Sequence, residues 1–284
     1  MMKLVIWDVQ HGSAAYLKTP SDKHIVVDLG AGNYSESDEA FSPLLYLRDN
    51  YGIKQLDQVI ITHPHTDHID DIMNFDALSP RVLSRPNHLT EETVRNANPG
   101  KDKQKLDKYF EIDKRYSYPV SSNEDPKRPE NNGGVQIQIF ISSECGTSEI
   151  NNHSIVSVIQ YQGVKILLPG DNESGSWKML LEKPEFVRAI ANTNIFIASH
   201  HGRESGYCAE LFRHFKPQLT IISDGPVQGT SVTEKYSQHT TGVPVYSRSG
   251  GTRTRRDRKC LTTRKDGTII ITVDDGGYIE ATIE

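Results

Sequence analysis

Thr62-His63-Pro64-His65-Thr66-Asp67-His68 places four potential metal ligands within six residues, directly after the apolar run Val59-Ile60-Ile61. That apolar run is typical of a buried strand. Alternate residues of extended backbone point to the same side, so His63 and His65 are expected to face one spot. Asp67 and His68 are expected to begin a helix, Asp67–Leu78, and to face that spot as well. Imidazole and carboxylate groups are ligands for zinc, manganese or iron.

Further candidate ligands follow other predicted strands. Asp171 comes after the strand Val164–Leu168, where its carboxylate could bridge two cations or could cap the next helix instead. The pair His200-His201 follows the strand Asn194–Ala198. Adjacent residues at a strand end tend to face opposite sides, so one histidine could bind metal while the other contacts substrate. A turn in the following loop could also bring both inward.

A third candidate is His153, in Asn151-Asn152-His153-Ser154, just ahead of another predicted strand. It is either a metal ligand or an exposed loop residue, and the sequence leaves both interpretations open. The complete set of candidate metal ligands is His63, His65, Asp67, His68, His153, Asp171, His200 and His201.

The remaining elements favour one domain, residues 1–284, with a two-sheet core and helices outside it. Residues 118–134 combine Pro119, Pro126 and Pro129 with several asparagines and glycines, and they predict a mobile loop near the mouth of the site. Predicted strands are Lys3–Val9, Ala14–Lys18, His24–Asp28, Asp57–Thr62, Val135–Ile141, Ser154–Tyr161, Gln218–Ile222, Thr268–Val273 and Gly277–Ile283. Predicted helices are Phe41–Tyr51, Lys101–Tyr116, Ser174–Lys183 and Ser205–His214.

Composition bounds the function. The 284 residues carry a net charge of −5, so the chain as a whole is not a nucleic-acid-binding polycation. No run approaches 18 apolar residues, so no membrane partner is expected. The three cysteines, Cys145, Cys208 and Cys260, are odd in number and widely spaced. They argue against a disulfide framework and favour a reducing cytoplasm.

One segment departs from the acidic balance. Residues 248–265 contain eight basic side chains and a single acid, Asp257. Arginine forks suit phosphate oxygens, so this stretch favours a phosphodiester substrate such as DNA or RNA. The alternative is a solvated surface hairpin. The residues expected to bind substrate are Arg253, Arg255, Arg256 and Arg258.

Together these motifs resemble the metallo-β-lactamase superfamily, whose signature is an HxHxDH loop followed by a His, an Asp and a final His at successive strand ends. Asp28, in Val26-Val27-Asp28-Leu29-Gly30, matches the acidic residue that supports the metal loop of that family. The resemblance implies an α/β (α+β) fold, a four-layer αββα sandwich. It also implies two metals, one held by His63, His65 and His153, the other by Asp67 and His68, with Asp171 bridging and His200 or His201 completing the set.

A closer resemblance is to the hydrolase domain of bacterial DNA-uptake channel proteins and its free-standing soluble relatives. It rests on Asp8-Val9-Gln10-His11-Gly12-Ser13, the Asn151-Asn152-His153-Ser154 segment, Pro169-Gly170-Asp171 and Ser199-His200-His201-Gly202. Gln10-His11-Gly12-Ser13 stands where that group has Gly-Gln-Gly-Asp, so an acidic residue is absent here. The membrane spans of the channel are absent too, so transport is not implied.

The expected activity is hydrolysis of phosphodiesters by a hydroxide that bridges two divalent ions, Zn²⁺ or Mn²⁺. Asp67 would orient this nucleophile, and His200, His201 or the distant His239 would serve the leaving group. Asp28, Asp70 and Asp71 are candidates to orient the ligating imidazoles. The alternatives are a carbonyl-centre hydrolase acting on a thioester, lactone or β-lactam, a di-iron protein, and a binding protein with a degenerate site.

Overall fold

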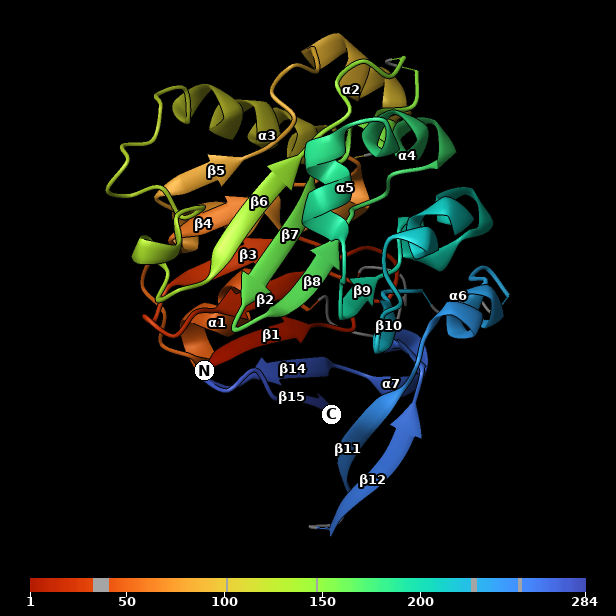
Figure 1. Ribbon diagram of the computed structural model, residues 1–284. Helices are drawn as coiled ribbons and strands as arrows, with labels where there is room; N and C mark the ends of the chain where they lie inside the picture. Colours follow the sequence, from red (N-terminus) through yellow and green to blue (C-terminus); the bar gives the residue numbers. More distant parts are fainter. Residues whose placement is uncertain (33–40, 101, 147, 226–228, 250–251) are drawn as a thin grey trace.

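Two β-sheets form the centre of the computed structural model, which describes the whole chain except residues 33–40, 101, 147, 226–228 and 250–251 (Figure 1). In the nine-stranded sheet the order is β12 (Thr252–Arg258), β11 (Val243–Ser249), β15 (Ile279–Ile283), β14 (Ile269–Val273), β1 (Met2–Ile6), β2 (Ala15–Lys18), β3 (His24–Val27), β4 (Gln58–Ile60) and β5 (Val82–Ser84). In the six-stranded sheet it is β13 (Cys260–Thr262), β10 (Leu219–Ile222), β9 (Ile195–Ile197), β8 (Val164–Leu168), β7 (Val156–Tyr161) and β6 (Gln136–Phe140).

Helices cover the outer face of each sheet. The larger sheet carries α1 (Pro43–Asn50), α2 (Glu91–Ala97) and α3 (Lys103–Arg115). The smaller sheet carries α4 (Ser174–Leu181), α5 (Pro184–Ile190) and α6 (Thr233–His239), and α7 (Thr263–Asp266) follows β13. Alternation along the strands creates this arrangement: Leu4 packs between the sheets, whereas the next residue, Val5, packs under the helices. The predicted four-layer αββα sandwich is thereby confirmed.

The strand directions bring the candidate ligands to one edge of the sandwich. β3 and β4 are parallel neighbours in one sheet, and β8, β9 and β10 are parallel neighbours in the other. Asp28 and the His63–His68 loop therefore follow adjacent strand ends, as do Asp171 and the pair His200-His201 on the facing sheet. Parallel strands deliver the loops that follow them to the same edge, which is where ligand sites of such sheets form.

The helix predicted at Asp67–Leu78 is not an α-helix. The segment forms two short 3₁₀ turns, Thr66–His68 and Ile72–Ala77. Between them the backbone pairs with Leu29, whose N–H donates to the His68 carbonyl and whose carbonyl accepts from Asp71 N–H. Those hydrogen bonds replace the ones a continuous helix would need. The predicted helix Ser205–His214 is likewise divided, into Glu204–Gly206 and Ala209–Arg213.

The loop at 118–134 lies away from the candidate site. A Cβ at Gly133 would stand only 2.8 Å from the Ser21 amide nitrogen, in the turn that precedes β3. Asn131 and Asn132 line a cavity with Lys23 and Asp57, residues at the start of β3 and β4. The metal loop follows the other ends of these strands, so the expected position at the site mouth was wrong. Composition identified an irregular segment but carried no information about where it packs.

Two further observations concern membrane-spanning helices and the cysteines. Among the described residues, no helix combines the length and apolar character needed to cross a membrane. All three cysteines carry free thiols.

Candidate metal centre

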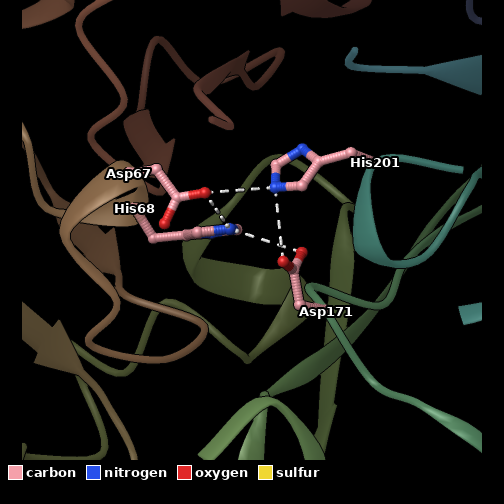
Figure 2. A group of neighbouring side chains, drawn as sticks. All are labelled: Asp67, His68, Asp171 and His201. Carbon is pink, nitrogen blue, oxygen red and sulfur yellow. Dashed lines mark ion pairs between the residues drawn. The ribbon is translucent and has the colours of Figure 1, made fainter. Parts of the chain in front are cut away.

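Four side chains from three loops converge on one point. The candidate ligand atoms of Asp67, His68, Asp171 and His201 all lie within 4.8 Å of one another (Figure 2). His201 Nε2 is 3.3 Å from Asp67 Oδ2 and 3.3 Å from Asp171 Oδ2. His68 Nε2 is 3.3 Å from Asp171 Oδ1. Two imidazoles and two carboxylates at this spacing are a ligand set that could hold a divalent metal ion.

A buried carboxylate holds His68 in place. Asp28, at the end of β3, is 1% exposed and accepts from the Thr62 N–H at 2.7 Å. Its second oxygen lies 2.8 Å from His68 Nδ1. Asp28 has a φ of 60°, a left-handed conformation that non-glycine residues rarely adopt. With Nδ1 donating to Asp28, the lone pair of His68 Nε2 is directed at the cluster.

Left-handed backbone also explains how His201 reaches the cluster. His200 and His201 have φ values of 49° and 54°, and the backbone turns with them after β9. The Nδ1 of His201 lies 2.9 Å from the Ser223 carbonyl, which leaves its Nε2 toward the two aspartates. Such strained residues persist only where surrounding contacts impose them, and they concentrate at functional sites.

The electrostatics of the four groups fit a cation site. Burial lowers the pKa of His201, but Asp171 and Asp67 prevail and raise it to about 10. Burial opposes ionisation of Asp67 too, yet the neighbouring imidazoles hold its pKa well below the usual range. The same balance lowers the pKa of Asp171. Two carboxylates thus stay ionised in a buried pocket because the imidazoles beside them supply positive charge and hydrogen bonds.

Unpaired polar atoms test whether a metal fits. His68 Nε2 and His201 Nε2 are buried and have no hydrogen-bond partner of acceptable geometry. Buried polar atoms almost always have partners, so two orphaned nitrogens facing two carboxylates need a further group. The described residues of the cluster therefore fit a divalent ion, with Asp67, His68, Asp171 and His201 available to hold it.

His63 and His65 mark a second position beside the first. His63 Nε2 and His65 Nδ1 are 3.0 Å apart, close to the spacing of about 3.3 Å expected for two nitrogens on one tetrahedral ion. The His63 ring centroid lies 4.2 Å from that of His68. Burial, then repulsion from His68, lowers the pKa of His63 well below its ordinary value, so this imidazole is neutral and able to bind metal.

His153 is turned away from this second position. Its Nδ1 lies 2.8 Å from His88 Nε2, and its Nε2 lies 3.4 Å from the Gly146 carbonyl. His153 is fully buried, so it is not an exposed loop residue either. His200 does reach the centre: its Nε2 lies 4.0 Å from Asp171 Oδ2, and its Nδ1 lies 2.8 Å from Glu173 Oε1.

Three residues at the site were missed by sequence reasoning. Glu173 orients His200, as just described. His11 lies with its Nε2 3.3 Å from Asp67 Oδ2, and its ring centroid is 5.0 Å from that of His201. Arg203 lines a cavity of about 280 Å³ together with His11, His65, Asp67, Asp171 and His200. The sequence signal for Arg203 was its position directly after the His200-His201-Gly202 turn.

Other expected positions lie elsewhere. Asp70 pairs with Lys105 on α3, and Asp71 accepts hydrogen bonds from Ser42 and Leu44 at the start of α1. In the part of the chain that the structure describes, neither aspartate pairs with a candidate ligand imidazole. His239 packs against Phe212 at 4.1 Å between ring centroids and lies 2.8 Å from the Tyr207 hydroxyl, in the aromatic cluster below α6.

The basic stretch forms the edge strand β12, which pairs only with β11 in the described chain and projects from the body of the sandwich (Figure 1). Arg253 pairs with Glu280 at 2.5 Å, and Arg255 lies 3.6 Å from Asp257. Arg258 makes two 3.0 Å bonds to Asp266, a carboxylate that is 7% exposed, so its guanidinium is occupied structurally. No ion pair of Arg256 is found among the described residues.

The chain belongs to the metallo-β-lactamase superfamily, whose family model matches residues 8–176. That segment begins just after β1, includes the HxHxDH loop and Asp171, and ends in the first turn of α4, so the family match covers most of the metal centre. Together with the ligand cluster, this membership defines a candidate metal-dependent hydrolase. None of the curated proteins matches the sequence.

Several solved structures are similar over most of the chain. One is a candidate zinc-dependent hydrolase of the superfamily from Thermotoga maritima, with 13% identity, 91% of this chain and 97% of that chain covered, and a TM-score of 0.40. A diphosphatase from the PhnP family has 10% identity, coverages of 90% and 99%, and a TM-score of 0.41. The di-iron β-hydroxylase CmlA from Streptomyces venezuelae has 14% identity, coverages of 78% and 44%, and a TM-score of 0.45. The family assignment rests on the family model and not on these distant alignments.

Proposed function

We propose that the protein hydrolyses phosphodiester bonds with two divalent metal ions, Zn²⁺ or Mn²⁺, and that its substrate is DNA, RNA or a smaller phosphodiester. The observation that carries this proposal is Arg203. It lies in the same cavity as Asp67 and Asp171 and forms no ion pair with any described residue. A guanidinium beside a metal centre suits the non-bridging oxygens of a phosphodiester and has no role toward a neutral ester.

Bound divalent ions would lower the pKa of water to about 7 and screen the negative charge that develops on the phosphoryl oxygens. Asp67, His68, Asp171 and His201 would hold one ion, with Asp171 shared with the His63–His65 position. Asp28 and the Ser223 carbonyl keep His68 and His201 in the tautomer that leaves Nε2 free.

The pair His200–Glu173 is suited to the leaving group. Glu173 accepts from His200 Nδ1, which fixes the ring, while His200 lines the cavity that also holds Asp171. A histidine oriented by a carboxylate is the arrangement that proton transfer to an alkoxide leaving group requires. His201 is committed to the metal cluster, and His239 lies outside the site, so His200 is the remaining candidate among the three.

The β12 arginines would act on a longer substrate. Arg253, Arg255 and Arg256 are on a projecting hairpin. After β12 the chain reaches Thr263, whose hydroxyl accepts from the Asp224 N–H at 3.2 Å. The residue after Asp224 is Gly225, where an added Cβ would stand 3.2 Å from the His11 Cβ. A polyanion bound in the cavity could extend along this edge. Arg258 is left out of this role because Asp266 occupies it.

Hydrolysis of bis-p-nitrophenyl phosphate by Mn²⁺- or Zn²⁺-loaded protein tests the proposal. Replacing Arg203 with Gln should lower kcat/KM for the diester by about 10- to 100-fold, the range expected for loss of charged hydrogen bonds. Arg213 is exposed, lies in the 3₁₀ turn Ala209–Arg213 and does not line this cavity, so Arg213→Gln is the matched control and should change little. Preference for a thioester or lactone, with no effect of Arg203→Gln, would overturn the proposal in favour of carbonyl-centre hydrolysis.

A second comparison addresses the polymer. Changing Arg253, Arg255 and Arg256 together to Gln should raise KM for an oligonucleotide and flatten the salt dependence of its binding, because fewer counterions are released. Turnover of the small diester should be unchanged, since it does not reach the hairpin. If the triple variant and the unchanged protein have the same KM for the oligonucleotide, β12 is not part of the substrate site.

A further inference from the structure

The His63–His65 position lacks a third protein ligand of its own when His153 is turned toward His88. Asp171 is shared with the other position, so an ion here would have two imidazoles and a bridging carboxylate. A further donor should be a buried polar atom that faces the cavity and has no partner. His68 Nε2 and His201 Nε2 carry that signature at the first position.

Asn151 Oδ1 carries the same signature. The Asn151 side chain is 8% exposed, and its Oδ1 is buried without a hydrogen-bond partner. Asn151 lines the same cavity as His65, Asp171 and His200.

The orientation of the Asn151 amide is fixed by its other end. Its Nδ2 donates to Glu173 Oε1 at 3.3 Å, and a carboxylate oxygen can only accept. The amide therefore cannot be flipped without placing two acceptors face to face, so Oδ1 is the end of the side chain that has no partner. Glu173 in turn accepts from His200, so one carboxylate positions both the amide and the imidazole.

The neighbouring asparagine shows what an ordinary structural role looks like. Asn152 Oδ1 accepts from the Glu173 N–H at 3.3 Å and from the Ser176 N–H at 3.1 Å, and so caps the start of α4. Two adjacent asparagines of almost equal burial thus differ in one respect. The oxygen of Asn152 is used by the backbone, and that of Asn151 is not.

We infer that Asn151 Oδ1 is a protein ligand of the metal at the His63–His65 position, in the place that His153 was expected to take. This inference rests on the proposed dinuclear centre. An amide oxygen is a harder donor than an imidazole, so the position should tolerate Mn²⁺ better, relative to Zn²⁺, than a three-histidine site would.

Metal binding by the full-length protein tests the inference without reference to hydrolysis. Metal-free protein is titrated with Mn²⁺, the number of ions bound is measured by elemental analysis, and electron paramagnetic resonance distinguishes a coupled pair from a single ion. Asn151→Leu should retain one ion and lose the coupled spectrum. Affinity for the ion at the second position should fall by more than about 100-fold, which exceeds the effect of removing a residue that only supports a ligand. Asn151→Asp keeps Oδ1 but loses the donor to Glu173, and should keep both ions.

Three comparisons make the outcome decisive. Asn152→Leu should lower the melting temperature yet bind two ions, and His153→Gln should bind two ions as well. Asn151→His should raise the preference for Zn²⁺ over Mn²⁺ relative to the unchanged protein. Retention of two ions by Asn151→Leu, or equal loss from Asn151→Leu and Asn151→Asp, would overturn the assignment. Because the readout is binding, wild-type protein that binds a coupled pair but hydrolyses no diester would refute the proposed substrate and leave the ligand assignment standing.

Discussion

Asp28 offers the sharpest test of how the protein prepares its metal ligands. Asp28→Asn preserves the size of the side chain and one oxygen, which can still accept from the Thr62 N–H at 2.7 Å. The other oxygen, 2.8 Å from His68 Nδ1, becomes an amide NH₂. Two donors cannot face each other, so His68 must move its proton from Nδ1 to Nε2. A protonated Nε2 cannot bind the metal that Asp67 and Asp171 would share with it.

The expected magnitude follows from the lost contact. Removing the group that orients a ligating histidine weakens metal binding by about 10- to 100-fold, or about 1.4 to 2.7 kcal/mol. In the metal-free protein, the same change removes a charge-assisted hydrogen bond at a fully buried site, which costs about 1.5 to 3 kcal/mol of the free energy of unfolding. Both quantities should change, because Asp28 acts on the histidine and on the Thr62 backbone.

Calorimetric titration of metal-free protein with Mn²⁺, paired with urea unfolding in chelator, measures both effects. Asp70→Asn is the matched control: it removes a carboxylate three residues beyond Asp67 that pairs with Lys105 outside the centre, and metal affinity should not change. Unchanged Mn²⁺ affinity in Asp28→Asn would refute the view that Asp28 sets the His68 tautomer. Equal weakening in both variants would show a general electrostatic effect instead.

Three further outcomes are expected. Asp67→Ala should abolish hydrolysis and lower the metal content while the circular dichroism spectrum stays native, because Asp67 is partly exposed and is a candidate metal ligand. Near-wild-type turnover would show that Asp67 has no part in the mechanism. Gly12→Ala should lower the free energy of unfolding, measured in urea, by about 1–3 kcal/mol, because the φ of Gly12 is 124° and a Cβ there would lie 2.5 Å from the Asp67 carbonyl oxygen. Gly52→Ala is the control and should have a smaller effect, since a Cβ at Gly52 would meet open space. In chelator, protonated His201, with a pKa raised from 6.5 to about 10, contributes stability that is complete below pH 6.5 and lost as the pH rises toward 10. In metal-loaded protein this ring is neutral throughout, so the free energy of unfolding should fall less between pH 6.5 and 10. A free energy of unfolding that does not change with pH in the metal-free form would contradict the assignment.

Much of the fold was readable from local patterns. The strand predictions locate β1, β2, β3, β8, β14 and β15 to within a few residues, because alternating burial and turn residues are encoded in neighbouring positions. The short strand β5 and the helices α2 and α5 were missed. The three residues Val82–Ser84 are too few to show a period, and their pairing with β4 is a tertiary contact.

The candidate site divides in the same way. His63, His65, Asp67 and His68 share one short loop, and their spacing alone predicts a common metal position. Asp171 and His201 come from the facing sheet, and their predicted convergence depended on the family resemblance. The structure brings them to within hydrogen-bonding range of the loop because the parallel strands β8 and β9 end at the same edge as β4.

The sequence by itself determined the ligand types, the strand ends that carry them and the sandwich that follows from strand alternation, because each of these is set by residues close together in the chain. Only the tertiary structure decided that His153 faces His88 whereas Asn151 faces the cavity, and that His11, Glu173 and Arg203 join the site. Those outcomes depend on side-chain direction at loop residues, including the left-handed His200 and His201. Such directions are fixed by contacts between segments distant in the chain, and no local pattern records them.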